Sequence, residues 1–253
     1  MNKSVDIAKA FTHIFDDPQW VGKSAVGALV SLVFVLNFAV YGYEVRVIRQ
    51  VSRGQRGPLP NWGDFGNMFG EGLALGLARL LVLLPIVFFV TAPVFGLLIG
   101  LPVIAAFVAQ AAEQNAERIV NGLAGVGLLG AGLMCGLGLS LSLAFAFVSP
   151  AMTAAYASQG TFSACFDVKE ISRFIRQNTR NYVMACLAGI GALFVINIAT
   201  LFLSSIPCIG WLLALPLGGL GVFYVLMVIG HAVGQVMALD DARHRVVVAA
   251  TAA

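Results

Sequence analysis

Residues 119–166 read IVNGLAGVGLLGAGLMCGLGLSLSLAFAFVSPAMTAAYASQGTFSACF and contain no Asp, Glu, Lys or Arg. A second stretch without these residues lies between Arg180 and Asp240. About 20 consecutive apolar residues are enough for a helix to span a bilayer, and a soluble domain of this size would rarely tolerate two such stretches. The sequence therefore predicts an all-α, polytopic membrane protein.

The composition supports the same fold class. Of the 253 residues, 59% are hydrophobic and 11% are charged, and the mean hydropathy is +0.91. Soluble domains carry about 25% charged residues, so we expect a single integral membrane domain over residues 1–253 and no soluble domain. The net charge of +3 suits a positive-inside bias better than a nucleic-acid surface, and no nucleic-acid partner is expected.

About five membrane segments are expected, at residues 21–43, 73–111, 119–148, 182–203 and 209–239. The second would form a helix of roughly 58 Å against a hydrocarbon core of about 30 Å. It contains Pro85, Pro93 and Pro102, which we expect to break or kink it. The short link SSIPCIGW between the last two segments makes them an antiparallel hairpin.

Basic residues predict the side of each loop. Four arginines lie in residues 44–72 and four Lys or Arg lie in residues 150–181, so both stretches are expected in the cytoplasm, with the tail 240–253. The links at residues 110–118 and 204–211 contain at most one basic residue and are expected outside. This arrangement requires residues 73–111 to cross an odd number of times.

The N-terminal stretch, residues 1–19, lacks the apolar run of a signal peptide, and nothing is expected to be cleaved. Lysines in it and just after it favour the cytoplasm, yet one crossing by residues 21–43 would place it outside. Either the positive-inside bias fails here, or this segment is a re-entrant hairpin that bends near Asn37 under the cover of other helices. We favour the hairpin.

Apolar stripes at helical spacing precede three of the segments. They are Ile7, Phe11, Ile14 and Phe15; Phe65, Met68 and Phe69; and Ile171, Phe174 and Ile175. Trp20, Trp62 and Tyr182 lie close by, and such rings prefer the headgroup level. We therefore predict short amphipathic helices on the cytoplasmic interface, residues 1–19 included. Alternatively, the stripes pack on the end of the bundle itself.

Three stretches resemble a known family: FDDPQW at residues 15–20, GYEVRVIRQVSRGQRGPLPNWGDFG at residues 42–66, and SPAMTAAYASQGTFSACFDVKEI at residues 149–171. The resemblance is to the uncharacterised prokaryotic integral membrane family catalogued as domain of unknown function 4013, over roughly residues 11–235. It implies a multi-pass helical protein of a bacterium or archaeon. That family has no established activity, so no residue inherits a role from it.

The run from Tyr41 to Trp62 contains a candidate binding site. Arg46, Arg49 and Arg53 fall on one face of a helix that continues out of the first segment, and Arg56 follows. Together with Trp62, these arginines could bind lipid phosphates or an acidic partner. The alternative is ordinary positive-inside anchoring, because four basic residues only just reach the size of a lipid-recognition cluster.

Polar residues are few within the apolar segments: Asn37, Arg79, Asn197, His231 and Gln235. Arg79 can snorkel to the headgroups, which leaves His231 as the deepest titratable group, one turn from Gln235. A proton relay or a cofactor ligand is conceivable. A lone histidine near a helix end is more often a hydrogen-bonded packing residue.

Small residues predict helix contacts. Gly230 and Gly234 form a small-xxx-small pair around His231, and Gly132 and Gly136 form a smooth groove for a helix of the same chain or of a partner. Four cysteines are expected to be packing residues, because they show no CxxC spacing. They are Cys135, Cys165, Cys186 and Cys208.

No Ser/His/Asp set, HExxH motif, carboxylate pair or metal-ligand spacing is visible in the sequence, and we expect no catalytic, metal or cofactor site. The favoured function is a non-enzymatic accessory, scaffold or assembly subunit of a complex in the inner cell membrane of a prokaryote, with a cytoplasmic C-terminus. The expected partners are the lipid bilayer and other membrane subunits or a homo-oligomer. The alternative is a transporter or lipid-handling protein in which residues 73–111 line a path.

Overall fold

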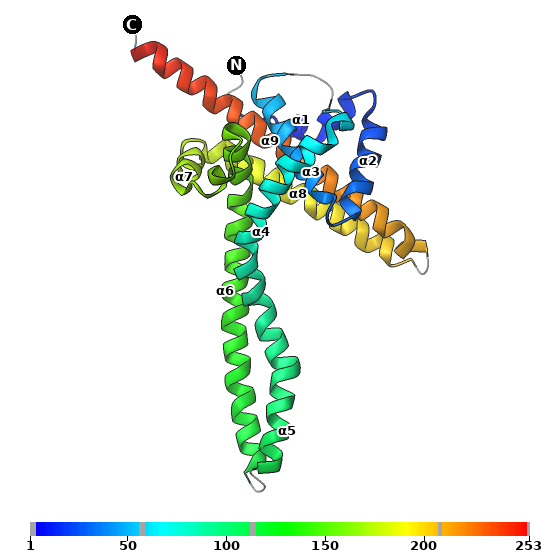
Figure 1. Ribbon diagram of the computed structural model, residues 1–253, viewed down its shortest axis with the longest axis vertical. Helices are drawn as coiled ribbons and strands as arrows, with labels where there is room; N and C mark the ends of the chain where they lie inside the picture. The colour runs from blue at the N-terminus through cyan, green and yellow to red at the C-terminus, as the bar shows by residue number, and fades with distance from the viewer. Residues whose placement is uncertain (1–3, 56–58, 112–114, 207–208, 252–253) are drawn as a thin grey trace. The chain divides into compact units, whose positions relative to one another are not determined.

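A computed structural model describes residues 4–55, 59–111, 115–206 and 209–251 (Figure 1). These residues form helices and no strands, which confirms the predicted all-α fold. The α-helices are α1 (Ile7–Thr12), α2 (Trp20–Leu32), α3 (Asn37–Ser52), α4 (Phe65–Phe95), α5 (Leu101–Ala111), α6 (Ala116–Gln159), α7 (Val168–Gln177), α8 (Thr179–Ser204) and α9 (Ile209–Thr251). Three 3-10 helices, η1 (His13–Asp16), η2 (Trp62–Asp64) and η4 (Phe162–Phe166), and the π-helix η3 (Gly96–Gly100) complete the described chain.

Four helical stretches in the described part of the chain are long and apolar enough to span a membrane. They are Trp62–Gln110, Glu117–Gln159, Thr179–Ser204 and Leu212–Arg245. The chain is therefore a polytopic helical membrane protein. It divides into two compact units: unit 1 consists of Met1–Ala78 with Val148–Ala253, and unit 2 consists of Arg79–Phe147.

The first apolar segment accounts for the difference between the five expected segments and the four spanning helices. It is divided into α2 and α3 by a turn at residues 33–36, where Val33 has an extended backbone. The bend predicted near Asn37 is therefore present. At 13 residues, α2 is roughly 20 Å long, which is too short to cross a hydrocarbon core of about 30 Å.

Helix α9 is the centre of unit 1. Helices α8, α2, α3 and α1 all pack against it, and the predicted pairing of α8 with α9 is confirmed (Figure 1). One apolar cluster includes Tyr43 and Phe223, both completely buried, and a second includes Ala188 and Val228. Burial of these side chains between helices fixes the positions of the short N-terminal elements that build the site described below.

Hydrogen bonds bring the N-terminal segment and the start of α8 to the same end of unit 1. The backbone N–H of Asp6 donates to Gln235 Oε1 on α9 at 2.7 Å. Asn178 Nδ2, just before α8, donates to Asp240 Oδ1 at 2.7 Å. The residues before α1, the residues before α8 and the C-terminal half of α9 therefore lie together.

The prolines of residues 73–111 were expected to break or kink the helix, and they do not break it; the kink stays a prediction. Helix α4 runs through Pro85 and Pro93 without a break. The π-helix η3 follows, and α5 then continues through Pro102. A proline removes one backbone donor and crowds the preceding turn, and a π-turn is one way for a helix to accommodate this without ending.

The three apolar stripes form different secondary structure, but each has at least one buried side chain. The first forms α1 and η1 and the third lies in α7, whereas Phe65, Met68 and Phe69 belong to the first turns of α4 and form no separate helix. Met68 is completely buried, and Ile14 and Ile171 are nearly so. Each stripe therefore contributes to packing on the bundle, as in the alternative interpretation.

Candidate functional site

A polar cavity of about 690 Å³ lies in unit 1 between the N-terminal segment, α3 and α9, and we call it the histidine cavity. The polar residues that line it are Ser4, Asp6, Lys9, His13, Asp16, Gln50, Gln55, His231 and Gln235.

The N-terminal segment is fixed to α9 by reciprocal hydrogen bonds. Gln235 Oε1 accepts from the N–H of Asp6, and Gln235 Nε2 donates to the carbonyl of the same residue at 3.0 Å. The Asp6 carboxylate caps α1 by accepting from the N–H of Lys9 at 2.9 Å, and Tyr224 Oη donates to the carbonyl of Phe11 at 3.0 Å. These hydrogen bonds satisfy backbone groups on both sides of α1, a helix too short to satisfy them with its own hydrogen bonds.

Two histidines stack inside the cavity. The rings of His13 and His231 lie 4.2 Å apart between centroids, with 23° between their planes. The two residues are 218 positions apart (231 − 13), and α1 docking on α9 brings them together. His231 is 9% exposed, so the stack is largely removed from solvent.

The hydrogen bonds fix the tautomers of both rings. His13 Nδ1 lies 2.9 Å from the carbonyl of Ala10, which can only accept, so Nδ1 of His13 carries a hydrogen. Gln235 uses Oε1 for Asp6, so its Nε2 faces His231 Nδ1 at 3.0 Å and donates to it. His231 Nδ1 is therefore an acceptor, and the neutral His231 ring carries its hydrogen on Nε2.

The stack thus offers one acceptor and one donor. Nε2 of neutral His13 is a buried acceptor without a hydrogen-bond partner among the described residues, and burial lowers the pKa of His13 below its ordinary value. Nε2–H of His231 is the donor. A buried acceptor without a partner costs about 1–3 kcal/mol, so the cavity favours a ligand that donates a hydrogen bond.

The charges around the stack nearly cancel. Lys9 Nζ forms an ion pair with Asp16 Oδ2 at 2.6 Å, and both side chains are about half exposed. Asp6 adds one carboxylate. In the described part of the chain, no three or more His, Cys, Asp or Glu side chains converge in a way that could hold a metal ion.

The predicted arginine site has a different environment. Arg46 Nη2 lies 2.7 Å from Asp64 Oδ2, and Arg49 Nη1 lies 2.8 Å from Glu71 Oε1. Arg49 Nε also donates to the carbonyl of Ala157 at 2.9 Å, which links α3 to α6 within unit 1. Two of the arginines are thus engaged with the protein's own acceptors.

The other members of the arginine run are separate from these ion pairs. Arg53 caps the end of α3 and is exposed, and Arg56, like Cys208, lies outside the described residues. Trp62 is half-buried; its ring stacks on Tyr43 with centroids 4.6 Å apart, and Nε1 donates to the carbonyl of Lys23 at 3.0 Å. Trp62 therefore packs in the core of unit 1.

The remaining intramembrane polar residues do not join the cavity. Asn197 Nδ2 donates to the carbonyl of Leu193 one turn back in α8 at 2.8 Å. Asn37 begins α3 after the turn, and its Oδ1 is buried. His231 and Gln235 alone among the predicted polar residues contribute to the histidine cavity.

The candidate packing glycines fall into two groups. A Cβ at Gly234 would lie 2.7 Å from Val51 Cβ, and one at Gly230 would lie 3.3 Å from Glu44 Cγ, so α3 approaches α9 closely at both. No described atom lies within 4 Å of a Cβ built at Gly132 or Gly136. In unit 2 the close approach is instead at Gly138, where a Cβ would lie 2.7 Å from Val90 Cγ2.

Sequence reasoning missed His13, Asp6, Asp17 and Lys23. Asp17 is 2% exposed and pairs with Lys23 Nζ at 2.7 Å, and the same Nζ donates to the carbonyl of Leu59 at 2.6 Å. Burial alone would raise the pKa of Asp17, but the hydrogen bonds from Lys23 and the Gln19 backbone hold it below its ordinary value. The DDPQ sequence before Trp20 was the available signal, since Asp before such a turn is a frequent cap.

Comparison with known proteins identifies a family for the chain, but that family has no known function. Residues 26–205 match the family described as protein of unknown function (DUF4013), which confirms the resemblance drawn from the sequence. No curated protein and no solved structure matches the chain. His13 and His231 both lie outside the matched residues.

Proposed function

The chain belongs to the DUF4013 family of proteins of unknown function, and from this premise we propose that it is a non-enzymatic accessory or assembly subunit of a membrane complex. A partner subunit binds at the histidine cavity. In this role the protein lies in the inner membrane of a prokaryotic cell, with the N-terminal segment, both basic stretches and the C-terminus in the cytoplasm.

The cavity is the observation that carries this function. It is about 690 Å³ in volume and combines a buried acceptor on His13 with a donor on His231 and exposed carboxylates. Such a mixed polar surface suits the side chains of a protein partner, which offer donors and acceptors together. The Asp6 carboxylate, which adds one negative charge beside the Lys9–Asp16 ion pair, favours a partner segment that contributes a Lys or Arg.

Two observations favour binding over chemistry or transport. The Nδ1 atoms of both histidines are used by amide groups, at Ala10 and Gln235, rather than by a carboxylate that would increase the basicity of the ring. The transporter hypothesis depended on a broken segment at residues 73–111, and α4 continues through its prolines.

The orientation follows from charge and from the contacts at one end of unit 1. Segments rich in Lys and Arg resist translocation, so both basic stretches favour the cytoplasm. The N-terminal segment bonds to α9 at Gln235, close to the tail that contains Arg243 and Arg245. A re-entrant α2–α3 pair allows the N-terminus to lie on the same side.

Photocrosslinking in native membranes tests the partner site. A photoreactive amino acid at Gln55, which is exposed and lines the cavity, is expected to give one crosslinked protein of defined mass. The same probe at Leu187, an exposed position on α8, serves as the control and is expected to give only lipid adducts. The protein crosslink should disappear with His231→Leu, and identical patterns at both positions would contradict the proposed site.

A further inference from the structure

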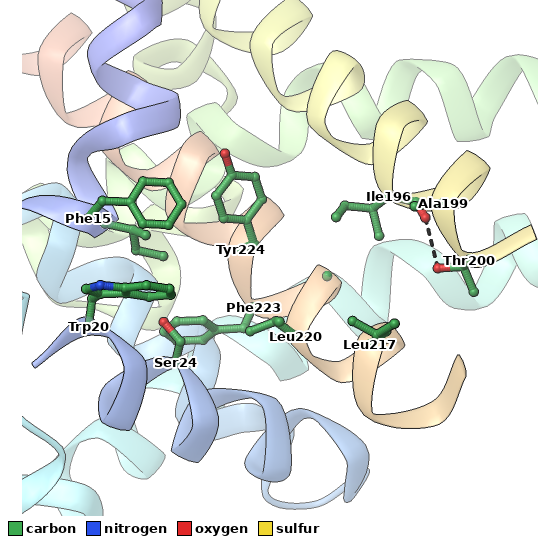
Figure 2. Close-up of a pocket in the computed structure, with 12 residues that line it drawn as sticks. Phe15, Trp20, Ser24, Ile196, Ala199, Thr200, Leu217, Leu220, Phe223 and Tyr224 are labelled. Carbon is green, nitrogen blue, oxygen red and sulfur yellow. Dashed lines mark hydrogen bonds between the residues drawn. The ribbon is translucent and has the colours of Figure 1, made fainter. Parts of the chain in front are cut away.

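A second cavity, of about 260 Å³, lies in unit 1 between η1, α2, α8 and α9 (Figure 2). It is apolar and has two ends of different character. Phe15, Trp20 and Tyr224 surround one end, and Ile196 and Leu217 surround the other (Figure 2). No charged side chain is among the described residues that line it. An apolar cavity of about 150 Å³ is already enough to bind benzene, so this one has room for a longer apolar group.

Ser24 is the unusual member of the lining. It is 3% exposed, and its hydroxyl has no hydrogen-bond partner among the described residues. Other helical hydroxyls bond the carbonyl four residues back: Ser31 to Gly27 at 2.7 Å on the same helix, and Thr200 to Ile196 at 2.8 Å across the cavity (Figure 2). Ser24 lines the part of the cavity to which Trp20 and Phe223 also belong (Figure 2).

A buried hydroxyl without a partner is destabilising, so the protein gains when a ligand supplies an acceptor. The ligand must also be apolar over the rest of its length, because the other lining side chains are apolar except for the Trp20 indole N–H and the hydroxyls of Thr200 and Tyr224, which are already bonded. Helix α9 rises roughly 10 Å between Leu217 and Tyr224, which line opposite ends, so the apolar part is elongated.

We propose that this cavity binds one acyl chain of a membrane glycerolipid, with Ser24 Oγ donating a hydrogen bond to the ester carbonyl. The source is the bilayer, since α8 and α9, which form the aliphatic end, are both long and apolar enough to span it. Trp20 lines the same end of the cavity as Ser24 (Figure 2). Tryptophan rings concentrate at the interfacial level of the bilayer, where the ester groups of lipids also lie, so the ester carbonyl is expected at this end. The absence of charge among the described lining residues makes the site selective for the ester and chain, not for the headgroup.

Lipid retention measures the site directly. Full-length protein is delipidated in mild detergent, reloaded from vesicles of palmitoyl-oleoyl phosphatidylglycerol or of its diether analogue, and analysed by native mass spectrometry. The wild type should retain the diester lipid about fivefold better than the diether lipid, the effect of one hydrogen bond. Ser24→Ala should remove that preference, and Ser31→Ala, whose hydroxyl is bonded within α2, should keep it.

A bulky side chain in the cavity provides the second arm. Ala199→Phe, in the lining, should reduce retention of both lipids, whereas Val195→Phe, an exposed position on the same helix outside the lining, should not. Equal retention of diester and diether lipid by the wild type would overturn the carbonyl contact. Unchanged retention in Ala199→Phe, or a protein dimer that fills the cavity in place of lipid, would overturn the acyl-chain site.

Discussion

Replacing Gly234 by alanine should destabilise the protein, whereas the same change at Gly136 should not. A Cβ at Gly234 would lie 2.7 Å from Val51 Cβ and 3.0 Å from the carbonyl oxygen of Ile48, so α3 and α9 must separate. Overpacking of this kind costs about 1–3 kcal/mol, and alanine in a helix gains about 1 kcal/mol over glycine, which leaves a net loss of about 1 kcal/mol. At Gly136 nothing opposes the gain, and the two variants should differ by about 2 kcal/mol.

The free energy of unfolding of both variants can be measured by reversible denaturation in mixed micelles. A double variant with Val51→Ala should recover only a small part of the loss at Gly234, because it removes Val51 Cγ1, at 3.0 Å from the added Cβ, but keeps Val51 Cβ. If Gly234→Ala is as stable as Gly136→Ala, the close approach of α3 to α9 is wrong. The sequence alone could not rank these positions, since both have the small-xxx-small pattern.

Three further predictions concern the polar groups of unit 1. Burial lowers the pKa of His13, so docking of α1 should be strongest well above pH 6.5 and should weaken as the pH falls below it, as seen by hydrogen exchange of α1. His13→Phe should reduce this pH dependence, with a remainder from the stacked His231, and an unchanged pH dependence would contradict the role of His13. Asp17→Asn should lower the free energy of unfolding by about 3 kcal/mol, because it leaves Lys23 nearly buried without its carboxylate, and an unchanged thermal midpoint would show that the pair contributes nothing. Arg49→Gln should destabilise by about 1 kcal/mol and the exposed Arg53→Gln should not, whereas equal effects in the same thermal assay would contradict the ion-pair network.

Much of the fold could be predicted because it depends on local composition. The two charge-free runs located three of the four spanning stretches, the apolar run at residues 73–111 located the fourth, and the SSIPCIGW link located the α8–α9 pair. The bend near Asn37 followed from the charge of the N-terminal segment, since one crossing would have placed its lysines outside. These properties can be read within one segment, without knowledge of which segments meet.

Features that depend on helix pairing could not be predicted in this way. Gly138 packs against Val90 while Gly132 and Gly136 do not, although all three lie in the same glycine-rich run. The effect of Pro85 depended on whether the chain could continue helical around it, which proline content alone does not determine.

The candidate site was the least predictable part. His231 and Gln235 were recognised as intramembrane polar residues, but their partners His13 and Asp6 lie more than 200 positions away in the sequence. The sequence does not show that Arg46 and Arg49 form ion pairs, because their partners Asp64 and Glu71 lie about 20 residues further along the chain. Only the tertiary contacts show which charged side chains are already paired.

The side of the membrane on which the N-terminal segment lies is the central question, because the histidine cavity needs α1 on the same side as the C-terminal half of α9. Ser4→Cys and Ser158→Cys, both at exposed positions in a cysteine-free background, can be labelled with a membrane-impermeant thiol reagent. We predict that neither reacts in intact cells and that both react after permeabilisation. Reaction of Ser4→Cys in intact cells, with Ser158→Cys protected, would contradict the re-entrant α2–α3 pair and the cytoplasmic cavity together.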